Sequence, residues 1–188
     1  MIRSIARPAL LVLALLWAAP VQARPSLIEK AGDDIQIILP AVAAVCAFGL
    51  RDLGDYAIRL AANLAVAHGS KNLLGDARIN LRPSGGDKGF PSGHTTVAFQ
   101  GASYLARDCV GNLPWARAAV FGAAVFVGGS RIEAGAHFLF QVVAGALLGL
   151  ASDRLFRRKR RPATRPNRLR LIGRKIRDRV ASRKSGPR

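Results

Sequence analysis

Five short apolar segments, separated by polar or Gly- and Pro-containing connections, constrain the fold of this chain most strongly. Each segment falls short of, or barely reaches, the ~20 residues that span a bilayer comfortably. Half of the 188 residues are hydrophobic but only 6% are aromatic, and small apolar residues let helices pack closely in lipid. The pattern predicts an all-α polytopic membrane helical bundle, with a soluble all-α domain as the alternative. The segments cover residues 35–50, 56–74, 95–106, 116–129 and 138–151.

Residues 1–23 resemble a secretory signal peptide, with a basic start, an apolar run and small residues before Arg24. They can instead form a first membrane helix, so we expect five helices in the mature protein, or six if this segment is retained. In both cases residue 24 begins on the outer side of the membrane. Single crossings then place three connections on that side, at residues 24–34, 70–94 and 130–137.

The net charge of +18 is concentrated in the C-terminal tail. Residues 154–188 hold 16 Lys or Arg against one acid, Asp178, so the preceding 153 residues carry only +3. Cytoplasmic segments hold the excess of basic residues, which predicts a membrane domain over 24–153 and a basic cytoplasmic tail. Apolar residues between Leu169 and Val180 suggest a short amphipathic helix on an anionic membrane surface. Nucleic acid is the weaker alternative partner, and none is expected.

The two cysteines, Cys46 and Cys109, lie in or beside apolar segments. Neither belongs to a CxxC motif or to a cluster of His residues, so they predict no metal site. Buried thiols that pack as small hydrophobic groups are the favoured interpretation, with a disulfide between them as the alternative.

Two arginines and two histidines lie near the ends of the apolar segments, on the predicted outer side. Guanidinium groups match phosphate oxygens, and imidazoles titrate near neutral pH. The turn Pro91-Ser92-Gly93-His94 leads into a helix whose first N–H groups are free to bind an anion. Gln141 lies four residues after His137 and can fix its tautomer by a hydrogen bond. The four residues are Arg82, His94, Arg131 and His137.

Three elements together resemble the motifs of the type 2 phosphatidic-acid phosphatase family, which is related to the vanadium haloperoxidases. They are Arg82-Pro83, the Pro91–His94 block, and the stretch from Ser130-Arg131 to His137. The resemblance covers roughly residues 30–152 and implies a vanadium-haloperoxidase-like fold and a reaction without metal or other cofactor. It implies His137 as the nucleophile that forms a phosphohistidine and His94 as the general acid. Phosphate oxygens would be held by Arg82, Arg131, Ser92 and Gly93.

The chain departs from the family pattern in two places. The family's first motif has a Lys seven residues before the Arg of Arg-Pro, where this chain has Gly75. Arg78 substitutes for it if the segment is continuously helical, and Lys71 if the helix breaks near Gly75.

The second departure is Gln141, which stands where the family usually has Asp. The glucose-6-phosphatases, which resemble this chain here, also have Gln at the equivalent position. A neutral amide can orient His137 but cannot stabilise an imidazolium by charge.

The resemblance implies a phosphatase for lipid phosphates or pyrophosphates at the outer face of a bacterial inner membrane, with its active site facing the periplasm. Undecaprenyl pyrophosphate, phosphatidic acid, phosphatidylglycerol phosphate and lipid A phosphates are all possible substrates. A phosphotransferase between lipids would use the same residues. A non-catalytic phosphate-binding scaffold is the alternative from another class, suggested by Gln141 and the displaced lysine.

Overall fold

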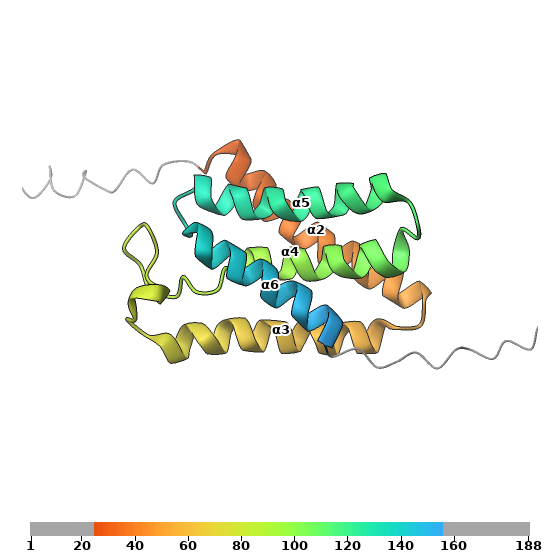
Figure 1. Cartoon of the computed structure of the whole chain (residues 1–188), viewed down its shortest axis with the longest axis horizontal. Helices are drawn as coiled ribbons and strands as arrows, with labels where there is room; N and C mark the ends of the chain where they lie inside the picture. Colours follow the sequence, from red (N-terminus) through yellow and green to blue (C-terminus); the bar gives the residue numbers. More distant parts are fainter. Residues whose placement is uncertain (1–24, 156–188) are drawn as a thin grey trace, which may run out of the picture. The chain divides into compact units, whose positions relative to one another are not determined.

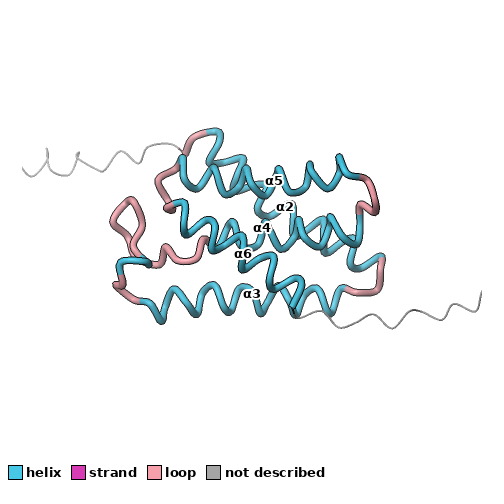
Figure 2. The backbone as a smooth tube through the Cα atoms, in the orientation of Figure 1, coloured by secondary structure: helices cyan, strands magenta, loops and turns pink. Residues whose placement is uncertain are grey.

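A computed structural model describes residues 25–155, which form an all-helical bundle (Figures 1 and 2). The segment 1–23 and the basic tail from residue 156 onward, including its expected amphipathic helix, lie outside the described residues. A single 3₁₀ turn, η1, interrupts the long connection after α3. The elements are α2 (Leu27–Gly49), α3 (Leu53–Leu74), η1 (Arg78–Asn80), α4 (Gly93–Tyr104), the π-helical turn η2 (Leu105–Cys109), α5 (Pro114–Glu133) and α6 (Leu139–Leu155).

All five predicted segments form helices, so the all-α prediction is confirmed for the described residues. The largest difference is at α2, which begins at Leu27, eight residues before the predicted start at 35. The Ser26 side chain accepts a hydrogen bond from the Glu29 backbone N–H and caps this helix. Four of the first eight residues of α2 are charged, and apolarity alone therefore does not reveal its start.

Helix α4 is the centre of the bundle and packs against α2, α3, α5 and α6 (Figure 1). Its closest neighbour is α6, where two glycines allow the backbones to approach. A Cβ atom added at Gly145 would lie 2.5 Å from the Ser92 carbonyl oxygen, and one at Gly149 would collide with the Thr96 carbonyl oxygen. The fold therefore requires residues without side chains at these two positions.

Polarity in the bundle is inverted relative to a water-soluble protein. Arg59, Gln100 and Asp153 are at most 1% exposed, whereas Leu73 and Leu155 are 90% and 77% exposed. Large apolar side chains also lie exposed along α2, α5 and α6. Such a surface is stable in an apolar solvent. Within residues 25–155, α2 is the one helix long and apolar enough to span a membrane by length and composition.

Cys46 and Cys109 form a disulfide that joins α2 to the π-helical turn after α4. Their Cα atoms are 6.2 Å apart, within the range that a disulfide bridges. The expectation of two free thiols was therefore wrong. The sequence gives no sign that Cys109, at the end of a π-helical turn, comes to lie against the C-terminal half of α2.

Candidate active site

The predicted site residues gather at one end of the bundle, which we call the motif end. The motif end is formed by the start of α2, the end of α3, the connection 75–92, the start of α4, the end of α5 and the start of α6 (Figure 1). A hydrogen bond of 2.9 Å from Ser26 to Glu133 joins the start of α2 to the end of α5. Residues that are more than 100 positions apart therefore meet there.

His137 is buried in the connection between α5 and α6, two residues before α6 begins. Its Nδ1 lies 3.2 Å from Oε1 of Gln141. Nε2 of Gln141 donates hydrogen bonds to the carbonyl oxygens of Ile79, at 3.0 Å, and Leu81, at 2.7 Å. The amide orientation is thus fixed, and Oε1 is the acceptor for Nδ1 of His137. The His137 ring also makes a hydrogen bond with the backbone of Gly89.

Gln141 also connects three parts of the motif end. Its side chain joins His137 to the connection that leads to Arg82, and its backbone carbonyl accepts a hydrogen bond of 3.0 Å from the Ser92 N–H. The Gln141 side chain is fully buried, and all of its hydrogen-bonding atoms have partners. An Asp at this position would be one carbon shorter and would offer no donor to the two carbonyls.

The state of His137 suits a nucleophile. Burial lowers the pKa of His137 to about 4, and the nearby charges of Lys71 and Arg82 contribute to the decrease, while the hydrogen bond to Gln141 opposes it. At pH 7 the ring is therefore neutral. Two cationic side chains lie close enough to act on this ring, which is the environment that a dianionic phosphate requires.

Lys71 lies in the last turn of α3, which ends at Leu74, just before Gly75. The Lys71 side chain is buried at the motif end, and a Cβ atom added at Gly93 would lie 3.9 Å from its Nζ. Arg78 lies in η1 with an exposed side chain. The helix break therefore brings Lys71, rather than Arg78, to the start of α4.

Arg82 lies in the connection between α3 and α4, where a turn is closed by a hydrogen bond of 2.7 Å from its own N–H to the Gly86 carbonyl. Its side chain donates a hydrogen bond of 3.4 Å to the Lys88 carbonyl. The buried Nε has no hydrogen-bond partner among residues 25–155. An unsatisfied buried donor next to His137 is suited to an anionic oxygen.

Ser92 is the N-cap residue of α4 and is completely buried. Its hydroxyl oxygen accepts a hydrogen bond of 3.0 Å from the Thr95 hydroxyl, and its backbone N–H is bonded to Gln141. Gly93 and His94 are the first two residues of α4. The helix N-terminus at Gly93 therefore points its partial positive charge into the motif end.

Asp33 on α2 contacts two of the predicted residues, although no motif includes it. Its Oδ1 lies 2.8 Å from a guanidinium nitrogen of Arg131 and 3.2 Å from Nε2 of His94. Arg131 itself is 4% exposed and is held further by a hydrogen bond of 2.7 Å to the Glu29 carbonyl. One carboxylate thus bridges the second and third motifs.

All predicted site residues except Arg78 lie at the motif end. Asp33 and Glu29, which were not predicted, contact them from α2. No group of three or more His, Cys, Asp or Glu side chains that could hold a metal ion occurs within residues 25–155. The arrangement offers a neutral imidazole, a second imidazole beside a carboxylate, and three cationic side chains. It can bind a phosphate group and present a nucleophile to it.

Comparison with known proteins identifies similar bacterial proteins. A Helicobacter pylori protein named lipid A 4'-phosphatase is 28% identical over 165 residues, which cover 79% of this chain and 81% of that protein. A Porphyromonas gingivalis protein named lipid A 1-phosphatase is 28% identical over 125 residues, which cover 63% of this chain but only 28% of that longer protein. No solved structure matches the chain.

The PAP2 superfamily model matches residues 52–165, more than half of the chain. The match includes all three motifs and Gln141, while α2 with Asp33 precedes it. The resemblance to the type 2 phosphatidic-acid phosphatases is therefore confirmed. The chain belongs to the PAP2 superfamily, a family of helical membrane phosphatases.

Proposed function

We propose that this chain hydrolyses phosphate groups of membrane lipids through a phosphohistidine at His137. The observation that carries the proposal is the buried imidazole of His137, whose Nδ1 lies 3.2 Å from Oε1 of Gln141. This contact fixes the orientation of the ring and leaves Nε2 as the nitrogen that would attack phosphorus. Membership of the PAP2 superfamily supports the reaction class.

The reaction has two steps. In the first, Nε2 of His137 attacks phosphorus, the bond between phosphorus and the lipid oxygen breaks, and His94 gives a proton to that oxygen. In the second, His94 takes a proton from water, whose oxygen attacks the phosphohistidine and releases inorganic phosphate. His94 returns to its first protonation state, so the cycle is balanced in protons.

Cationic groups stabilise the charge that develops on the phosphate oxygens. Lys71 and Arg82 lie close enough to act on His137, and Lys71 and Arg131 close enough to act on His94. The N-terminus of α4 adds its own partial positive charge. The Asp33 carboxylate pairs with Arg131 and His94. We infer that substrate phosphate takes over the contact with Arg131, while Asp33 keeps His94 oriented.

Lipid A is the substrate class favoured by the relatives, since both carry names of lipid A phosphatases. The shared chemistry is a phosphate monoester on a lipid. In the orientation set by the basic tail, several helices cross the inner membrane and the motif end faces the periplasm, where lipid phosphates of the outer leaflet are accessible. The exposed apolar side chains around the bundle support a membrane-embedded domain.

The test is phosphate release by purified protein in EDTA from a panel of lipid A, phosphatidic acid, phosphatidylglycerol phosphate and undecaprenyl pyrophosphate. We expect the highest kcat/KM with lipid A and a loss of about 10³-fold or more for His137→Ala and for His94→Ala. Activity that survives either substitution contradicts the proposed mechanism. Transfer of the phosphate to another lipid without release would identify a phosphotransferase, and phosphate binding without turnover a scaffold.

A further inference from the structure

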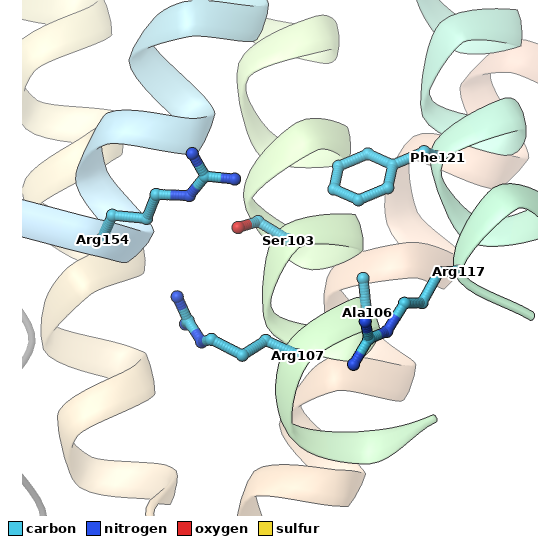
Figure 3. A pocket seen from close by; sticks show the side chains of 6 residues that line it. All are labelled: Ser103, Ala106, Arg107, Arg117, Phe121 and Arg154. Atoms are coloured by element: carbon cyan, nitrogen blue, oxygen red, sulfur yellow. The ribbon is translucent and has the colours of Figure 1, made fainter. Parts of the chain in front are cut away.

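A second cluster of cationic side chains lies at the end of the bundle opposite the motif end. It surrounds a pocket of about 250 Å³ between the end of α4, the start of α5 and the end of α6 (Figure 3). The pocket belongs neither to the three motifs nor to the proposed reaction. We call it the arginine pocket, and its lining residues are Ser103, Ala106, Arg107, Arg117, Phe121 and Arg154.

Arg107 is fixed in position by two carboxylates. One of its guanidinium nitrogens lies 2.6 Å from Asp153, and its Nε lies 3.4 Å from Asp108. Asp153 is completely buried and also accepts a hydrogen bond of 2.7 Å from the Ser103 hydroxyl. The guanidinium group is thereby preorganised, but its charge is largely balanced.

Arg117 and Arg154 carry the unbalanced charge of the arginine pocket. Arg117 donates a hydrogen bond of 3.2 Å to the Asn112 amide oxygen, which carries no charge. In the described part of the chain, no carboxylate lies within 4.0 Å of the cationic nitrogens of either arginine. Figure 3 shows Arg154 and Arg107 extending from different elements toward the space beside Ser103, while Arg117 extends from α5 toward Ala106 on the other side of α4. Such an arrangement attracts an anion with several oxygens.

One wall of the arginine pocket is apolar. It consists of Ala106 and Phe121, whose ring centroid lies 6.4 Å from that of Phe99. The volume of about 250 Å³ is below the roughly 300–1,000 Å³ of sites that enclose a whole small molecule. The small volume and the apolar wall both fit a ligand that has a phosphate, a short polar linker and apolar chains that remain outside the pocket.

We propose that the arginine pocket binds the phosphate headgroup of an anionic glycerophospholipid. Arg154 would hold the phosphate oxygens beside Arg107, while Arg117 would contact the polar part of the headgroup and the glycerol end of the lipid would lie against Phe121. Basic pockets between membrane helices are typical sites for such headgroups.

The arginine pocket is separate from the active site. Along α6, Arg154 lies ~20 Å from Gln141 at ~1.5 Å per residue, and along α5, Arg117 and Arg131 are separated by a similar distance. A lipid bound here would therefore contact α4, α5 and α6 without reaching His137. The substrate and this lipid occupy opposite membrane faces in the proposed orientation.

The test is native mass spectrometry of the full-length protein in a neutral detergent, with phosphatidylglycerol, phosphatidylcholine or inorganic phosphate added. We expect one tightly retained phosphatidylglycerol, little phosphatidylcholine, and no comparable retention of inorganic phosphate. Because each basic residue near a membrane surface contributes about 1 kcal/mol, Arg117→Gln/Arg154→Gln should weaken phosphatidylglycerol binding by about 30-fold.

The matched control is Lys30→Gln/Arg51→Gln, which removes two exposed basic residues outside the arginine pocket and leaves the tail intact. It should bind phosphatidylglycerol like the wild type. Both pocket substitutions are at exposed side chains, and each single variant is measured as well, in case the double variant unfolds. Equal binding by wild type and pocket variants would overturn the proposal, as would equally tight retention of inorganic phosphate or phosphatidylcholine.

Discussion

The amide of Gln141 makes hydrogen bonds that a carboxylate cannot make. Its oxygen accepts from His137 and from the Phe138 backbone N–H, at 3.2 Å each, and its nitrogen donates to the carbonyls of Ile79 and Leu81. A carboxylate would place negative oxygens against these carbonyls. The local structure thus explains the departure from the family Asp, because Gln141 contacts both His137, the proposed nucleophile, and the connection that carries Arg82.

The substitution Gln141→Glu tests this role at constant side-chain length. We expect a decrease in kcat/KM of about 10- to 100-fold, since two buried carbonyls lose their donors at a cost of about 1–3 kcal/mol. Gln141→Asp should not rescue activity, because the shorter side chain reaches neither carbonyl. The measurement is phosphate release as a function of pH. Activity of either variant at or above the wild-type level would contradict the positioning role.

The motif residues could be predicted from sequence, whereas Asp33 could not. Each motif is a local pattern, and Pro91-Ser92-Gly93-His94 has its chemistry within four positions. Asp33 gains its role only by meeting His94 and Arg131 from a distant helix. The apolar segment that follows Asp33 begins only at Ile35, so the sequence assigns Asp33 to the connection 24–34 rather than to a helix. The choice between Lys71 and Arg78 also needed the structure, because it depends on where α3 ends.

At the scale of the helices, the contact between α4 and α6 sets the relative position of His94 and His137, the two histidines that we propose to be catalytic. His94 lies at the start of α4, and His137 is fixed through Gln141 on α6. Gly145 and Gly149 permit this contact. A change in the separation of the helices would move His94 away from the phosphate that His137 attacks.

Gly145→Ala and Gly122→Ala form a matched pair that tests this packing. A Cβ at Gly145 would lie 2.5 Å from the Ser92 carbonyl oxygen, whereas one at Gly122 on α5 would meet nothing within 4 Å. We expect Gly145→Ala to destabilise the bundle by about 1–3 kcal/mol and to lower activity. Gly122→Ala should be neutral or stabilising by about 1 kcal/mol, because alanine favours helix. Thermal unfolding in detergent measures both, and equal effects would contradict the packing account.

Helix existence was predictable from apolar periodicity, but helix ends were not. The start of α2 contains Glu29, Lys30, Asp33 and Asp34, which hydropathy assigns to a connection. At the other end of the bundle, α4 stops at Tyr104 and continues as a π-helical turn, closed by a hydrogen bond of 3.0 Å from Val110 N–H to the Leu105 carbonyl. The local Ser26 cap marks the start of α2, and hydropathy does not detect such a cap.

At the scale of the whole molecule, the disulfide favours an oxidising compartment for its end of the bundle, whereas the proposed orientation places that end on the cytoplasmic side. Cys46 and Cys109 lie at the end of the bundle opposite the motif end, which the orientation assigns to the cytoplasmic side, where thiols are normally reduced. The disulfide of the structure predicts that neither cysteine is alkylated when membranes are isolated in the presence of an alkylating agent and without reductant. Two alkylated thiols would contradict the disulfide and would agree with a cytoplasmic location of this end.

The central claim is that His137 becomes covalently phosphorylated during turnover, and trapping this intermediate tests it most directly. Purified protein is mixed with lipid A labelled in its phosphate and quenched within one turnover. We expect label that is stable to alkali and labile to acid, located on His137, and absent from His137→Ala. Turnover without such a label, or a label that survives His137→Ala, would contradict the account.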